Sequence, residues 1–168
     1  MPNAALFGVL ADPAYPATQS VIADLQAAAR ALGLQVVIVN VRTDRDLETA
    51  FATFQQRRVG GVLVGQSTFF RVRTEQLAAL AARHALPAIY SYREFALSGG
   101  LVSYGSSFGY MYHLIGLYTG RILKGDKPAD LPVQQVTKIE LVINMKTAKA
   151  LGLTFPLTLL GRADAVVE

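Results

Sequence analysis

Polar and aromatic residues follow several short apolar runs of this chain, at the points where those runs end. If the runs are strands of one parallel sheet, their carboxyl ends lie along one edge, where open α/β sheets bind ligands. Tyrosines there offer an apolar ring and a hydroxyl, and helix-start N–H groups attract carboxylates. The predicted ligand contacts are Asp12, Pro13, Tyr15, Gln66, Ser67, Thr68, Tyr92, Glu94, Tyr104 and Gly105.

Signals for catalysis are weak in the sequence. The chain has no cysteine, and it lacks the GxGxxG, GxxxxGK[ST] and GxSxG motifs. His84 and His113 have no second ligand at metal-binding spacing. We therefore expect no enzyme activity, no metal and no cofactor. A flavodoxin-like enzyme or regulator that holds an anionic cofactor on the Asp12 and Ser67 loops stays open as an alternative.

The composition is that of a globular domain with a large core. Hydrophobic residues make up 52% of the 168 residues and charged residues 17%. The net charge of +4 is scattered rather than gathered in a stripe, which predicts no nucleic-acid binding. The N-terminus does not resemble a signal peptide, and no apolar run reaches the length of a membrane span.

The spacing of apolar residues indicates the elements that must position these loops. Strands are expected at residues 5–10, 36–41, 61–65, 88–90 and 101–104, and helices at 18–32, 46–58, 74–84, 94–97 and 107–123. Strands that alternate with helices predict an α/β fold: a doubly wound parallel sheet of flavodoxin-like order 2-1-3-4-5.

The tail differs from this alternation. Two further strands are expected at residues 133–137 and 140–144, then a short helix at 147–151 that Gly152 ends. We predict a ligand-binding lobe over residues 1–125 and a tail over 126–168, which packs on the lobe or on a partner chain. A seam near residue 106 is the other candidate boundary.

Five segments of the sequence, taken together, resemble one protein family. They are AARHALPAIY at 81–90, REF at 93–95, GGLVSYG at 99–105, GRILKGDKPADLPV at 120–133 and ELVINMKTAKALGL at 140–153. They are similar to tryptophan/tyrosine-type substrate-binding proteins of ABC transporters, whose fold resembles type I periplasmic binding proteins. The resemblance implies a non-catalytic receptor outside the cytoplasm, an amino-acid-like and aromatic solute, and a transporter permease as partner.

The resemblance covers only the second of the family's two lobes and its tail, so it implies a truncated, one-lobe form. It also implies that helix 107–123 and the tail strands belong to the absent lobe. Because that helix is apolar, we expect it to be covered by a second copy, as a homodimer or swapped pair. An orphan dimerising domain without a ligand is the remaining alternative.

Three positions depart from the family pattern. Asp12-Pro13 replaces Asn-Pro, Ser67-Thr68-Phe69-Phe70 replaces Asp-Pro-Phe-Phe, and the long helix lacks the Asp and Arg expected near Tyr110 and His113. Glu94 and Tyr104 match the family strings, and Glu94 suits a ligand amine. The alternative role for Glu94 is to cap the short helix that follows it.

Overall fold

The structure of the chain is a computed structural model that describes residues 4–135 and 137–168. A seven-stranded sheet runs through it in the order β2-β1-β3-β4-β5-β6-β7. The strands are β1 (Leu6–Ala11), β2 (Gln35–Asn40), β3 (Val62–Val64), β4 (Ala88–Tyr90), β5 (Val102–Ser106), β6 (Ile139–Asn144) and β7 (Ala165–Val167). The predicted α/β class and the order of the first five strands are confirmed.

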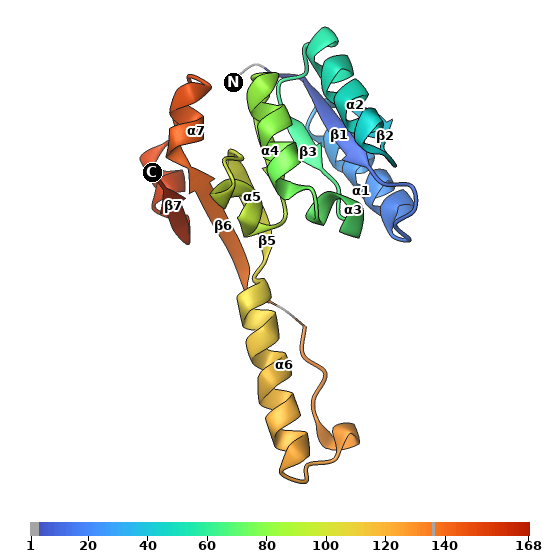
Figure 1. The fold of residues 1–168 in the computed structure, drawn as a ribbon, viewed down its shortest axis with the longest axis vertical. Coiled ribbons are helices and arrows are strands. Elements are labelled where there is room, and N and C mark those ends of the chain that lie inside the picture. Colours follow the sequence, from blue (N-terminus) through green and yellow to red (C-terminus); the bar gives the residue numbers. More distant parts are fainter. Residues whose placement is uncertain (1–3, 136) are drawn as a thin grey trace.

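Helices connect these strands, and all but α6 and the 3₁₀ turn η1 lie against or beside the sheet (Figure 1). They are α1 (Thr18–Ala31), α2 (Asp44–Gln56), α3 (Thr68–Arg71), α4 (Thr74–Arg83), α5 (Arg93–Leu97), α6 (Phe108–Leu123), α7 (Met145–Ala150), α8 (Leu157–Leu160) and the 3₁₀ turn η1 (Pro128–Asp130). The sequence pattern missed α3, because four residues are too few to show a helical period.

The main core lies on the face of the sheet that α2, α4 and α5 cover. Phe51 and Phe54 of α2, Leu77 of α4 and Phe95 of α5 are each fully buried in one cluster. Strand residues alternate between the two faces. Gly8 lies so close to the Phe54 ring that a side chain would collide with it, whereas the next residue of β1 faces α1.

The tail completes the sheet instead of leaving it. β6 pairs antiparallel with β5, with Ser103 opposite Val142, and β7 pairs parallel with β6. β6 corresponds to the strand expected at residues 140–144, which the resemblance assigned to the absent lobe and which here pairs with β5; β7 was not predicted. The division of the chain at residue 125 stays a prediction.

The strand expected at residues 133–137 does not form at the described positions; Val136 lies outside the described residues. Residues 133–135 run beside α6 without a neighbouring strand to pair with, and Val133 is 98% exposed. Alternation of apolar and polar residues makes a strand only where another strand offers hydrogen bonds.

Helix α6 projects away from the sheet as an arm, and the chain returns beside it (Figure 1). None of its residues is buried. Tyr118 on the arm donates its hydroxyl proton to the carbonyl oxygen of Pro132 on the returning segment, at 2.7 Å. The expectation that this helix is apolar and in need of a cover agrees with the exposure of Ile115, Leu117 and Leu123, which are 50 to 82% exposed.

Candidate functional site

The carboxyl ends of β1, β3, β4 and β5 lie on the side of the sheet from which α6 projects (Figure 1). A cavity of about 240 Å³ lies there, between α3, α5 and the first turns of α6. We call it the aromatic pocket. Its lining residues are Arg71, Thr74, Tyr92, Glu94, Phe108 and Tyr112.

Three aromatic rings form a continuous apolar surface in this pocket. The Phe108 ring lies 5.0 Å from the Tyr92 ring and 6.3 Å from the Tyr112 ring, measured between centroids. Phe108 and Tyr112 are four residues apart on α6 and therefore share one face of the helix. These rings suit the flat apolar part of a solute.

The start of α6 is fixed by polar contacts that hold Phe108 in place. The Ser107 hydroxyl oxygen accepts a hydrogen bond from the Tyr110 N–H and caps the helix. The same hydroxyl donates to the Glu140 carboxylate on β6 at 2.7 Å, and Arg93 pairs with that carboxylate at 3.4 Å. One carboxylate thus joins α5, β6 and α6 beside the pocket.

The pocket carries one cation and one anion. The Arg71 guanidinium lies 6.0 Å from the centre of the Phe108 ring, and it has no carboxylate within 4.0 Å among the residues that the structure describes. Glu94 in the first turn of α5 is exposed, and its side chain caps nothing in the described structure. A solute with both a carboxylate and an ammonium group can pair with these two side chains.

The pKa of Tyr92 is shifted by its surroundings in the pocket. Partial burial raises the pKa of its phenol, the Arg71 charge acts in the opposite direction, and Tyr15 and Glu94 raise the pKa further.

The structure brings only some of the predicted contacts together. Tyr92 and Glu94 line the aromatic pocket, whereas Asp12, Tyr15 and Gln66 line a separate cavity of about 30 Å³ beneath the start of α1. Pro13 is half-buried in the same loop, and Thr68 is exposed.

Asp12 and Ser67 have local structural roles. One Asp12 carboxylate oxygen accepts a hydrogen bond from the Ala14 N–H at 2.9 Å, and its carbonyl oxygen accepts one from the Thr18 hydroxyl. The Ser67 hydroxyl oxygen caps α3 by accepting from the Phe70 N–H at 3.2 Å. Both side chains therefore shape loops, which weakens the alternative of an anionic cofactor held there.

Tyr104 and Gly105 lie on β5, outside the aromatic pocket. Tyr104 is 58% exposed. Gly105 lies against the main chain of Ser91, where a Cβ atom would collide with the carbonyl oxygen. Because glycine has no side chain, Gly105 lets β5 approach the end of β4 closely.

Sequence reasoning missed Arg71, Thr74, Phe108 and Tyr112. A signal existed for the last two: aromatic residues at i and i+4 directly after a strand end and a serine cap. Arg71 carries no such signal, because its position depends on the short helix α3. Across residues 4–135 and 137–168, no group of three His, Cys, Asp or Glu side chains is placed to hold a metal ion.

Solved structures share the fold closely. A conserved domain protein from Vibrio cholerae aligns with a TM-score of 0.84 at 23% identity, over 99% of this chain and 56% of its own. An ABC domain from Streptococcus pneumonia in complex with L-Trp aligns with a TM-score of 0.84 at 24% identity, over 99% of this chain and 58% of its own. The substrate-binding protein CD0873 from Clostridium difficile aligns with a TM-score of 0.72 at 19% identity, over 99% and 55%.

This chain thus spans a little over half the length of these structures. A comparison with curated protein sequences gave no match. The family model described as ABC transporter substrate binding protein matches residues 1–167. That match covers nearly the whole sheet, α6 and the tail, and the chain belongs to the family of ABC transporter substrate-binding proteins.

Proposed function

We propose that this chain binds an aromatic amino acid, or a closely related zwitterion, in the aromatic pocket and serves as the solute receptor of an ABC uptake transporter. The observation that carries the proposal is that Arg71 and Glu94 line one cavity with three aromatic rings. The guanidinium pairs with the solute carboxylate, Glu94 with its ammonium group, and Phe108 with its ring. The L-Trp complex of the pneumococcal structure supports this solute class.

A thermal-shift titration of the 168-residue chain with L-tryptophan, L-tyrosine and L-alanine tests the proposal. A solute at about 100 times its dissociation constant stabilises the chain by about 2.7 kcal/mol. We expect a shift with the two aromatic solutes and none with L-alanine. Glu94→Ala reduces the shift, whereas Asp24→Ala, which removes an exposed carboxylate on α1, retains it in full. No shift with any solute contradicts the proposal.

We also propose that the permease of the transporter is a partner and that the receptor works outside the cytoplasm, as the family does. Among the described residues, no helix is both long and apolar enough to cross a membrane. A pull-down of the chain with the permease in detergent, in the presence and absence of L-tryptophan, tests this partnership. Loss of capture in both conditions counts against it.

A second copy of the chain is the proposed cover for α6. Ile115 and Leu117 are 52% and 50% exposed, and residues 108–120 carry no Asp, Glu, Lys or Arg. Two such helices can pair without bringing like charges together, and the apolar area is withdrawn from water.

Light scattering over a range of protein concentrations tests the homodimer. We expect the mass of two chains at high concentration and a shift to one chain in Leu117→Asp. Leu157→Asp replaces another exposed leucine, on α8, and is expected to leave the dimer intact. A single-chain mass at every concentration would rule the homodimer out.

A further inference from the structure

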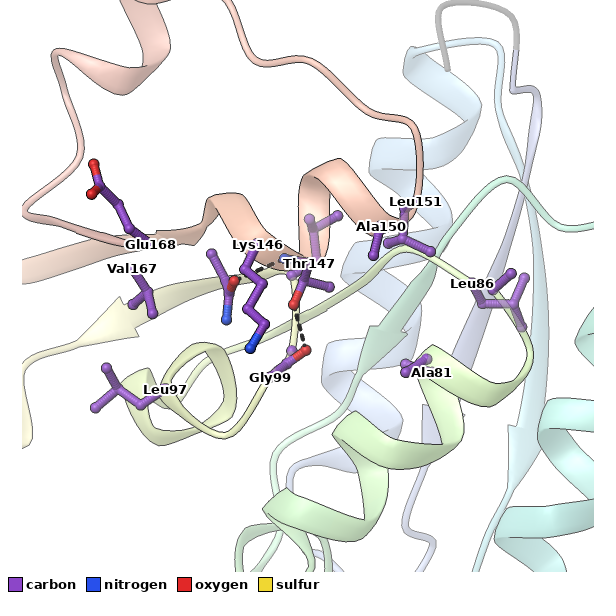
Figure 2. Close-up of a pocket in the computed structure, with 15 residues that line it drawn as sticks. Ala81, Leu86, Leu97, Gly99, Lys146, Thr147, Ala150, Leu151, Val167 and Glu168 are labelled. Carbon is purple, nitrogen blue, oxygen red and sulfur yellow. Dashed lines mark hydrogen bonds between the residues drawn. The ribbon is translucent and has the colours of Figure 1, made fainter.

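A second cavity lies at the opposite edge of the sheet, where β4 and β5 begin and β6 ends. Its volume is about 530 Å³, and it lies between the end of α4, the turn between α5 and β5, and α7. Figure 2 shows the side chains that line it. Among them are Ala81, Leu86, Leu97, Leu101, Ala150 and Leu151. This aliphatic cavity shares no lining residue with the aromatic pocket.

The walls of the aliphatic cavity contain no aromatic side chain among the described lining residues. Leucine and alanine side chains present a surface that alkyl groups fill well, without the quadrupole that favours an aromatic ring. The volume falls in the range of about 300–1,000 Å³ that is typical of small-molecule sites. The walls therefore favour an aliphatic occupant.

Two polar residues of the cavity use their hydrogen bonds to build its walls. Asn144 accepts from the Thr147 N–H and donates to the Ala96 carbonyl oxygen, both at 2.9 Å. The Thr147 hydroxyl donates to the Gly99 carbonyl oxygen at 2.8 Å. These bonds fasten α7 to the turn after α5, so the cavity has a fixed shape.

Lys146 is the cation of the cavity. Its amine points toward the turn at Gly99, whereas the Glu168 carboxylate turns away from it (Figure 2). Lys146 forms no salt bridge in the part of the chain that the structure describes. The long methylene stem of a lysine lies on apolar walls while its ammonium group binds an anion.

We infer that the aliphatic cavity binds a small aliphatic carboxylate. The alkyl chain lies against the leucine and alanine walls, and the carboxylate pairs with the Lys146 ammonium group. This site is separate from the aromatic pocket, since it lies on the other edge of the sheet and draws on none of its residues.

Amide chemical shifts of the ¹⁵N-labelled chain during a titration with sodium octanoate test the inference, and 1-octanol serves as the uncharged match. Octanoate is expected to shift Gly99, Gly100, Leu101 and Thr147. Lys146→Met keeps the stem and removes the charge. It weakens octanoate binding about tenfold, the loss of one charge-assisted contact, and leaves 1-octanol binding unchanged.

A second variant tests the cavity itself. Ala150→Trp adds a large side chain at an exposed position of α7 and is expected to abolish the binding of both compounds. Arg71→Ala is expected to leave octanoate binding unchanged. Equal octanoate affinity in Lys146→Met, or shifts confined to α6 or the aromatic pocket, would overturn the inference. Neither result tests L-tryptophan binding in the aromatic pocket, which is measured separately with Arg71→Ala and Glu94→Ala.

Discussion

The ring of Tyr92 lies against the ring of Phe108 with centroids 5.0 Å apart. A residue that follows β4 thus contacts the first turn of α6 directly. Because Phe108 also lies 6.0 Å from the Arg71 guanidinium, this one ring joins three segments that are distant in the sequence. The aromatic pocket therefore depends on where α6 begins.

Phe108→Ala is expected to weaken the binding of L-tryptophan about tenfold. Removing the ring takes away an aromatic contact worth about 0.5–1.5 kcal/mol beyond the area that it buries. Isothermal titration calorimetry measures the change. Tyr104→Ala is the matched control, because Tyr104 is an exposed aromatic residue outside the pocket. If the control weakens binding as much as Phe108→Ala does, the solute lies on β5 and not in the aromatic pocket.

Removing one charge from the pocket is expected to change which tryptophan analogue binds best. Glu94→Gln weakens L-tryptophan and tryptamine but spares 3-indolepropionate, which has no amine. Arg71→Ala weakens L-tryptophan and 3-indolepropionate but spares tryptamine, which has no carboxylate. Each loss is expected to be about tenfold, as for one charge-assisted hydrogen bond. Equal effects on all three compounds would mean that neither charge pairs with the solute.

The first five strands and the longer helices were predictable from the sequence because each strand is a short apolar run and α1, α2 and α4 each have an apolar face. Phe51 and Phe54 lie three residues apart, so a helical period places both in the core. The start of α2 was predicted at residue 46, two residues later than Asp44, where the helix begins, because Thr43 and not Asp46 is its N-cap. The Thr43 hydroxyl accepts from the Asp46 N–H at 3.2 Å, and the Asp46 carboxylate accepts from the Thr43 N–H at 2.9 Å.

The pairing of β6 and the aromatic pocket could not be predicted in the same way. Ser107 and Glu140 are 33 residues apart, and nothing local to either residue indicates that they meet. Arg71 reaches the pocket through a helix of four residues, too short for a period. Tertiary contacts of this kind follow from the topology of the tail. The alternation of apolar and polar residues over 133–137 predicted a strand there and so gave the wrong topology.

Tyr90→Phe is expected not to destabilise the chain near neutral pH. Tyr90 is 1% exposed, and its hydroxyl has no hydrogen-bond partner among the described residues. A buried hydroxyl without a partner costs free energy, so its removal is neutral or stabilising by about 1 kcal/mol. Urea denaturation at pH 7 measures the free energy of unfolding. A loss of more than about 1 kcal/mol would indicate a hydrogen bond that this geometry lacks.

The same residue predicts a loss of stability in alkali. Burial raises the pKa of Tyr90, the nearby Tyr92 adds to the increase, and the Arg71 charge opposes it. In the unfolded chain a tyrosine ionises near pH 10. The contribution of Tyr90 to stability is therefore constant below about pH 10. It falls as the pH rises further, because Tyr90 loses its proton in the unfolded state before it does so in the folded state. Tyr90→Phe is expected to reduce this slope.

Gly105→Ala is expected to destabilise the chain by about 1–3 kcal/mol, the usual cost of overpacking a tight site. A Cβ atom at this position would collide with the main-chain oxygen of Ser91 and push β5 away from the end of β4.

Gly116→Ala on α6 is the matched control, since nothing lies within 4 Å of the position that its Cβ would occupy. Alanine favours a helix over glycine by about 1 kcal/mol. Circular dichroism should show unchanged or greater helicity in Gly116→Ala and a lower melting temperature only in Gly105→Ala. An equal loss in both variants would mean that the close approach of β5 to Ser91 does not limit stability.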